Sequence, residues 1–230
     1  MRAHFGGSSR KSLVASRVSL DAAVKGADAN SASALSSELF FVADVLSTNI
    51  AVRRALTDPS RDGKAKAAFI SDLLGKKIGA LALGLVTELS SLRWSSPKDL
   101  VLVVEQLAIE AEASAANIAG ELDRVEDEIF TAATAFAGSS ELRKALTSDA
   151  TNAKAILVAD ILKGASGSTV KLVSQMVNAW RGRSIESAFA DYQWALAARR
   201  NRVIALVRVA APITQAQIDR LSTTLTSKVG

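Results

Sequence analysis

The sequence contains no cysteine and only one histidine, His4, near its start. Without thiols the chain forms no disulfide and offers no thiolate ligand to a metal, and one imidazole is too few for a zinc site. No group of residues supplies a nucleophile, a general base and an oxyanion site together. We therefore predict a non-catalytic protein, with no catalytic, metal-binding or cofactor-binding residue and no cofactor.

Long apolar runs are also missing, although 49% of the residues are hydrophobic and the mean hydropathy is +0.20. A membrane-spanning helix needs roughly 18 or more apolar residues in succession. Charged residues such as Lys76, Lys77 and Glu88 interrupt the longest candidates. Residues 1–7 lack the apolar core of a signal peptide. The sequence thus predicts a cytosolic protein with no direct membrane span.

The chain is basic, with a net charge of +5 at pH 7 and an isoelectric point near 9.6. Such a charge permits nucleic acid, anionic lipid or an acidic protein face as a partner. The densest basic group consists of Arg181, Arg183, Arg199, Arg200 and Arg202. The aromatic residues near it, Trp180, Tyr192 and Trp194, mostly fit the apolar stripe of a helix, whereas stacking on bases needs exposed rings. We predict no nucleic-acid partner and interpret the charge as a solvated basic surface.

One stretch of the chain occurs twice. The pentapeptide Arg53–Thr57 returns as Arg143–Thr147, 90 residues later, and Leu74 returns as Leu162, 88 residues later. The offset changes inside a predicted loop, which is two residues shorter in the second copy, and apolar positions match apolar positions on both sides. We therefore predict a tandem duplication of one helical unit.

Helical periodicity runs through most of the chain, with apolar residues three to four positions apart. Serine caps and proline and glycine breaks set the boundaries: Ser96 precedes Pro97 at one helix start, and Gly75 follows another helix as its C-cap. The predicted helices are Ser8–Lys25, Ser33–Ser47, Asn49–Leu56, Asp62–Leu74, Ile78–Leu92, Pro97–Asn117, Glu121–Ala137, Ser140–Leu146, Asn152–Leu162, Val170–Trp180 and a last one capped by Ser184. We expect Ile78–Leu92, the most apolar of them, to be the buried centre of its bundle.

The character of the sequence changes near residue 201. Arg202–Ala210 is rich in β-branched residues and predicts a strand, and Thr214 with Gln217 forms a capping box for a final helix. A lone strand leaves two edges unpaired. The predicted fold is therefore mainly all-α, with two tandem helical bundles followed by an incomplete α/β segment. The predicted domains are a first bundle at 1–117, a second bundle at 118–200 and the start of a C-terminal α/β domain at 201–230.

The segment Arg200–Gln217 resembles a junction in the delta subunit of F-type ATP synthases, whose mitochondrial counterpart is the oligomycin sensitivity-conferring protein. There a helical bundle leads into a strand, an Ala-Pro pair and a helix with glutamine near its start. The order of elements from Leu146 to Ala198 is similar as well, including Arg-Gly-Arg before the last helix. Some bacterial members carry an extra bundle, which would account for Ser8–Asn117.

This resemblance implies a non-catalytic peripheral-stalk subunit. The bundle would sit on the catalytic head and receive the N-terminal helices of alpha subunits in grooves between its helices. The C-terminal part would join the b subunit and hold the head stationary during proton-driven ATP synthesis, at the cytoplasmic face of the cell membrane. The family continues with further strands, so we expect a fragment or a truncated C-terminal domain, which puts attachment to the b subunit in doubt.

The candidate partner-binding residues line the two helices predicted to be buried, one in each bundle: Leu81, Leu85, Leu89, Val170, Val173, Val177 and Trp180. Taken one by one, these residues fit a plain hydrophobic core better than a groove wall. Two alternative functions stay open at this point: a helical-repeat adaptor that binds another partner's amphipathic helix, and a basic nucleic-acid-binding helical protein.

Overall fold

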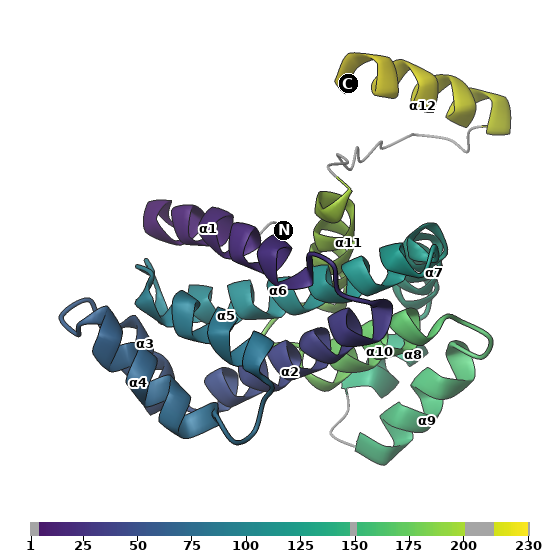
Figure 1. The fold of residues 1–230 in the computed structure, drawn as a ribbon. Coiled ribbons are helices and arrows are strands. Elements are labelled where there is room, and N and C mark those ends of the chain that lie inside the picture. Colours follow the sequence, from purple (N-terminus) through teal and green to yellow (C-terminus); the bar gives the residue numbers. More distant parts are fainter. Residues whose placement is uncertain (1–4, 148–150, 201–213, 230) are drawn as a thin grey trace.

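The computed structural model describes residues 5–147, 151–200 and 214–229, most of which are helical (Figure 1). The helices are α1 (Gly7–Val24), α2 (Ala29–Thr48), α3 (Ile50–Thr57), α4 (Gly63–Leu74), α5 (Ala80–Ser91), α6 (Pro97–Ile118), α7 (Leu122–Gly138), α8 (Ser140–Thr147), α9 (Thr151–Ile161), α10 (Gly167–Asn178), α11 (Ile185–Arg199) and α12 (Gln215–Val229). The prediction of a mainly helical fold is confirmed, and these ranges contain no strand. The strand predicted at 202–210 lies outside the described residues.

Polar caps mark the start of several helices. Ser96 caps α6 by accepting a hydrogen bond of 3.2 Å from a backbone N–H of the first turn, and Pro97 is the first helical residue, as predicted. Helix α2 begins before the predicted Ser33, because the Asp28 carboxylate accepts a backbone hydrogen bond of 2.7 Å and caps the helix there. Residues 29–32, which lie outside the predicted helices, are therefore helical.

Two further local predictions concern helix ends. Gly75 ends α4 as predicted, but in a right-handed conformation with φ of −59°. A Cβ at Gly75 would lie 2.5 Å from the carbonyl oxygen of Ser71, so lack of space requires glycine here. At the start of α12, the N–H of Thr214 donates to Gln217 Oε1 at 2.8 Å and the N–H of Gln217 donates to Thr214 Oγ1 at 3.4 Å, which confirms the capping box.

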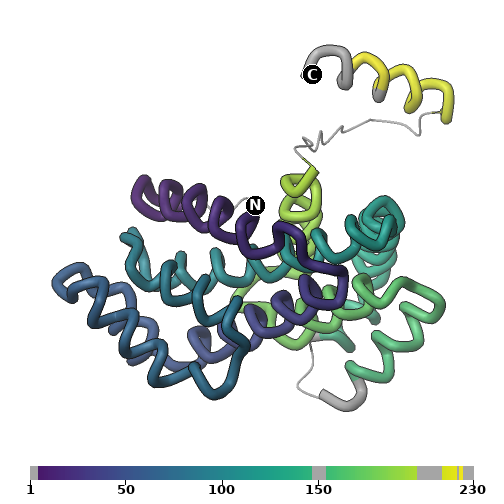
Figure 2. The backbone as a smooth tube through the Cα atoms, viewed as in Figure 1, coloured from purple at the N-terminus to yellow at the C-terminus, as the bar shows by residue number. Residues whose placement is uncertain are grey.

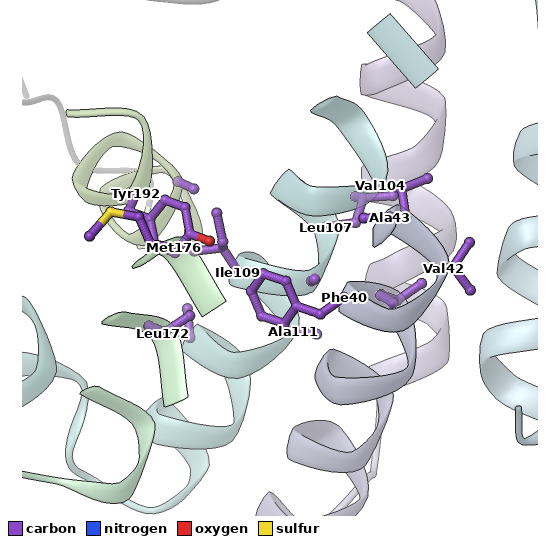
Figure 3. Packing of buried hydrophobic residues seen from close by; sticks show 14 of the residues in the cluster. Phe40, Val42, Ala43, Val104, Leu107, Ile109, Ala111, Leu172, Met176 and Tyr192 are labelled. Atoms are coloured by element: carbon purple, nitrogen blue, oxygen red, sulfur yellow. The ribbon is translucent and has the colours of Figure 1, made fainter. Parts of the chain in front are cut away.

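Helix α6 is the centre of the fold. Nearly every residue from 100 to 116 is buried, and α1, α2, α3, α7, α10 and α11 pack against this helix. Figure 3 shows how α2, α6, α10 and α11 contribute side chains to one hydrophobic cluster. The sequence had pointed to Ile78–Leu92 as a buried centre, but α5 keeps an exposed side on which Leu81 is 51% exposed.

The two halves of the chain follow the same order of elements. A long helix, a short helix and three further helices make up α2–α6, and the same order recurs in α7–α11. The pairs α3–α4 and α8–α9 lie on opposite sides of the molecule (Figure 1 and Figure 2). Buried residues of both halves nevertheless belong to one continuous cluster. Within the described residues the halves therefore share a core, with α6 common to both.

Across the described ranges, 5–147, 151–200 and 214–229, no single helix combines the length and apolar character needed to cross a bilayer. Only α2 and α3 taken together reach that length and composition, and a bend of 101° separates them. Their core-facing sides are buried within the protein.

Candidate interaction surface

The central helix α6 buries three carboxylates, those of Glu105, Glu110 and Glu112, each with 2% or less of the residue exposed. Moving an unpaired carboxylate from water into a protein interior costs several kcal/mol, roughly, even after relaxation. Each of these glutamates must therefore have a cation or several hydrogen-bond donors beside it. The partners come from helices distant in the sequence, and they show how the outer helices are attached to α6.

Glu105 lies at the centre of the largest of these clusters. Its Oε1 is 2.7 Å from Arg183 Nη2 and 3.4 Å from Arg181 Nε, and it accepts a 3.3 Å hydrogen bond from the Tyr192 hydroxyl. Burial, with the Glu105 charge adding to it, raises the pKa of Tyr192 well above its ordinary value. Burial alone would lower the pKa of Arg183, but Glu105 raises it. Arg183 therefore remains charged while buried.

The turn before α11 is held in place by the same ion pairs. Arg181 adopts a φ of 51° and Gly182 a φ of 76°, so two successive residues are left-handed. Such a backbone costs on the order of 1 kcal/mol or more at a residue other than glycine. Arg181 also pairs with Asp44 of α2 at 2.8 Å, so one side chain joins the turn to both α2 and α6. These contacts offset the backbone strain and fix the second half against the first.

The other two glutamates attach further helices to α6. Glu110 accepts three hydrogen bonds from the Arg17 guanidinium of α1, at 2.6, 2.9 and 3.2 Å. Glu112 pairs with Lys171 of α10 at 2.8 Å and accepts a hydrogen bond of 3.0 Å from Ser33 of α2. Arg17, Lys171 and Ser33 come from three different helices, so α6 joins the two halves through charges as well as through apolar packing.

A fourth carboxylate, Glu128 of α7, holds the loop before α10. Its oxygens accept hydrogen bonds from Thr169 Oγ1 at 2.6 Å, from Ser166 Oγ at 2.8 Å and from the Ser166 N–H at 3.0 Å, and Arg124 lies 2.8 Å away. Burial alone would raise the pKa of Glu128, but these bonds lower it to about 2. In the sequence, Glu128 ends an acidic run that fits a solvated helix start, so its structural role was missed.

Replacing Glu128 with glutamine should destabilise the protein in a pH-dependent way. The pKa of Glu128 is about 2 in the folded protein against an ordinary 4.5, so ionisation stabilises the fold above pH 4.5 and this is lost as the pH falls towards 2. We expect Glu128→Gln to lower the free energy of unfolding by about 1–2 kcal/mol at pH 7, after allowing for partial exposure. Urea denaturation between pH 7 and pH 2 measures the free energy of unfolding of this variant, and Asp127→Asn, at an exposed position of the same helix, is the control. Identical pH profiles for the two variants would contradict the assignment.

Exposed apolar side chains occur on α1 and on the neighbouring α5. Val14 and Val18, one turn apart on α1, are 60% and 66% exposed, and Leu81 of α5 is 51% exposed. Ser12 Oγ donates to the Arg93 carbonyl at 2.6 Å and Ser19 Oγ donates to Glu88 at 2.7 Å, so α1 lies along α5 and the segment after it. We use the name α1–α5 face for these three exposed residues, Val14 and Val18 on α1 and Leu81 on the neighbouring helix α5.

The predicted partner-binding residues are divided between core and surface. Leu85, Leu89, Val173 and Val177 are at most 4% exposed and belong to the core. Leu81 is exposed, and Val170 and Trp180 are partly buried. The leucine spacing of α5 marks its inward side, since Leu85 and Leu89 face the core. Helix α10 packs against α6, α7 and α9, which leaves it little open surface.

The basic group near α11 is largely neutralised within the protein. Arg181 and Arg183 pair with Glu105, while Arg199 pairs with Asp21 and Arg200 with Asp123. Arg202 lies outside the described residues. The Tyr192 ring is fully buried, and Trp180 and Trp194 are partly buried, with the Arg17 guanidinium 5.0 Å from the centre of the Trp194 ring. Within the described part of this group, each arginine thus has a carboxylate partner, and none of the three aromatic residues is exposed.

No group of three or more histidine, cysteine, aspartate or glutamate residues in the described part of the chain has the spacing to hold a metal ion. The carboxylates that come together on α6 are instead occupied by arginine, lysine and hydroxyl partners. In the described residues, the buried charges therefore form ion pairs that hold helices together.

Comparison with known proteins identifies the group to which the chain belongs. The ATP synthase delta (OSCP) subunit family matches residues 110–230. ATP synthase subunit delta of Streptomyces coelicolor is 40% identical over 227 residues, 97% of this chain and 82% of that protein. Subunit delta of Kineococcus radiotolerans is 39% identical over 230 residues, which cover 97% of this chain and 82% of that protein. Subunit delta of Salinispora arenicola is 39% identical over 214 residues, which cover 92% of this chain and 78% of that protein. The chain belongs to the ATP synthase delta (OSCP) subunit family.

The resemblance carried by Arg200–Gln217 and by the order of helices is thus confirmed. The family match begins within α6, at residue 110, whereas the delta relatives match nearly the whole chain. Helices α1–α5 are therefore shared with these delta subunits and are not peculiar to this chain. The α1–α5 face lies in this shared part, ahead of the family match.

Proposed function

We propose that this delta-family chain links the catalytic head of the F-type ATP synthase, through the N-terminal helices of alpha subunits, to the b subunit of the stalk. Members of the family are non-catalytic subunits of the peripheral stalk of this membrane-associated complex. Its task is mechanical, because it keeps the head from turning during proton-driven ATP synthesis. A core held together by ion pairs between distant helices suits a part that transmits torque without deforming.

The α1–α5 face is the proposed seat of an alpha-subunit helix. An amphipathic helix docks through apolar residues three to four positions apart, into a groove whose walls present exposed apolar side chains. Val14 and Val18 have this spacing on α1, and Leu81 adds an apolar side chain from α5. Exposed apolar side chains are common singly, but two valines one turn apart on one helix, with an exposed leucine on the neighbouring helix, favour a docking surface.

We also propose that the chain arose by duplication of one helical unit, with α6 serving both copies. The order of helices in α2–α6 and α7–α11 supports this, together with the repeated sequence at Arg53–Thr57 and Arg143–Thr147. In the second copy, α10 is enclosed by α6, α7 and α9, and Lys171 reaches the Ser33 carbonyl of α2 at 2.9 Å. The first copy is therefore the better candidate for the alpha subunit.

The C-terminal segment, 201–230, is the proposed attachment point for the b subunit, which would place the protein at the cytoplasmic face of the cell membrane. In its described part, α12 exposes Ile218 by 43% and Leu221 by 38%. These residues lie three positions apart, on one side of the helix. An apolar side of this kind needs a covering element, which further strands of the same domain or the b subunit would supply.

The proposed head binding is tested by gel filtration at physiological salt. The chain is mixed with a head assembled from alpha, beta and gamma subunits of the same source, and we expect it to co-elute. Co-elution should be lost when the alpha N-terminal segments are trimmed. Absence of co-elution, with both components folded, would reject head binding and favour the helical-repeat adaptor. Apolar docking should change little between low and physiological salt, whereas phosphate-backbone binding would weaken steeply.

A further inference from the structure

A basic cavity opens at the N-terminus of α4. Its volume is about 450 Å³, and its walls come from the α3–α4 loop, the first turn of α4, the segment after α5 and the start of α1. Three cationic side chains line it, those of Arg61, Lys66 and Arg93, against a single lining carboxylate, that of Asp62. This excess of positive charge in one concave site attracts anions and raises their local concentration.

Lys66 is the most informative of the three cations. It is only 6% exposed, yet no described carboxylate lies within ion-pair distance of its ammonium, and no described group forms a hydrogen bond with that ammonium. Most of the Lys66 side chain is packed against the protein, but its Nζ is not among the fully buried atoms that lack a partner, so the ammonium stays in contact with solvent. The position of Lys66 in the cavity wall places this uncompensated charge where a small anion can reach it.

The neighbouring carboxylates are occupied with other donors. Asp62 caps α4 by accepting from the backbone N–H of Lys64 at 3.2 Å. Asp58 accepts from the Ser60 hydroxyl at 2.6 Å and from the Ser60 N–H at 2.9 Å. These hydrogen bonds lower the pKa of Asp58, with smaller contributions from Arg61 and Lys66. The carboxylates thus stabilise the turn and the helix start, and leave the lysine without a direct partner.

The backbone around the cavity also favours an anion. Helix α4 has 12 residues, and its N-terminus carries the positive end of the helix dipole together with N–H groups that the helix does not use. Gly63, the first residue of α4, forms part of the wall and lets a ligand approach this end closely. The carbonyl end of α5 lies nearby, where Ser91 borders Gly63. Three side-chain cations outweigh this opposing dipole.

We propose that this cavity binds a phosphate group, with Lys66 as its principal contact and with Arg61, Arg93 and the N-terminus of α4 around it. Three cations about one site favour a doubly charged oxyanion over a single carboxylate. The hydroxyl group of Ser8 in the same wall can donate to a further phosphate oxygen. The volume admits both free phosphate and a phosphate carried by a nucleotide. The site does not depend on the proposed stalk role.

Isothermal titration calorimetry of the full chain tests this proposal, with inorganic phosphate and ADP as separate probes and ionic strength held constant with chloride. We expect binding by the wild type and an affinity for the preferred probe about tenfold or more weaker in Lys66→Met, since charge-assisted contacts are the stronger ones. The matched control is Lys64→Met, which removes the same charge from the exposed side of the same helix, and its affinity should stay within about twofold.

Phosphate and ADP binding equally would identify free phosphate as the ligand, and tighter binding of ADP would identify a nucleotide. The proposal is overturned if the wild type binds neither probe, or if Lys66→Met and Lys64→Met bind alike. Circular dichroism confirms the fold of each variant. Arg93→Gln provides a second variant at an exposed position of the wall, and it should weaken binding by about threefold or more.

Discussion

Replacing Glu105 with alanine should lower the free energy of unfolding by about 3–5 kcal/mol, which is the usual cost of removing one partner from a buried ion pair. The change leaves Arg181 and Arg183 without their shared carboxylate and removes the acceptor for the Tyr192 hydroxyl. Arg183 retains Asp191 at 3.3 Å and Arg181 retains the half-exposed Asp44, but neither contact is as well buried as Glu105. A domain with a total stability of roughly 5–15 kcal/mol loses a large part of it.

Urea denaturation at pH 7 measures this loss, with Glu121→Ala as the matched control. Glu121 lies near the start of α7 and pairs with Arg124 at 4.0 Å, with 47% of its side chain exposed. An exposed pair of this kind contributes about 1 kcal/mol or less. A loss below 1 kcal/mol for Glu105→Ala would show that Arg181 and Arg183 are adequately paired without Glu105. The ion pairs of Glu105 would then not be a main source of stability.

The central role of α6 could not be predicted from the sequence. Its helical limits were predicted to within a residue, because Ser96 and Pro97 mark the start locally. In the sequence, however, Glu105 and Glu110 interrupt an apolar run and indicate a solvated side. Their partners lie far away: Arg183 is 78 residues from Glu105, and Arg17 is 93 residues from Glu110. Periodicity describes one helix at a time, so it does not show which charges become paired in the interior.

Periodicity was also an incomplete guide to the candidate surface, because it indicated the buried side of a helix but not its exposed apolar residues. The leucine stripe of α5 was a sound indicator of burial, and Leu85 and Leu89 are indeed core residues, whereas Leu81 at the helix start is exposed. Val14 and Val18 were missed as surface residues. A signal for them was present, because α1 carries Leu13 and Leu20 on its buried side and two valines on the opposite side. A helix that is apolar on two sides needs two covering partners.

The double substitution Val14→Asp with Val18→Asp should abolish co-elution with the catalytic head. Two apolar anchors lost from the centre of a helix-in-groove contact weaken binding by roughly 2–4 kcal/mol, which is about 30-fold to 1,000-fold in the dissociation constant. Both side chains are at least 60% exposed in the free protein, so the fold should lose no more than about 0.5 kcal/mol per site. Gel filtration and a thermal melt of the same sample separate loss of binding from loss of structure.

Phe130→Asp is the control for this test, because Phe130 is 64% exposed on α7, in the second half of the chain and outside the α1–α5 face. If the alpha-subunit helix docks on the first half, Phe130→Asp co-elutes normally, the valine double variant does not, and Leu81→Asp is weakened. If Phe130→Asp alone loses the head, the docking surface belongs to the second half and the α1–α5 face is wrongly assigned. These three variants thus decide which half of the chain binds the head, a question that the repeated sequence leaves open because it makes the halves alike.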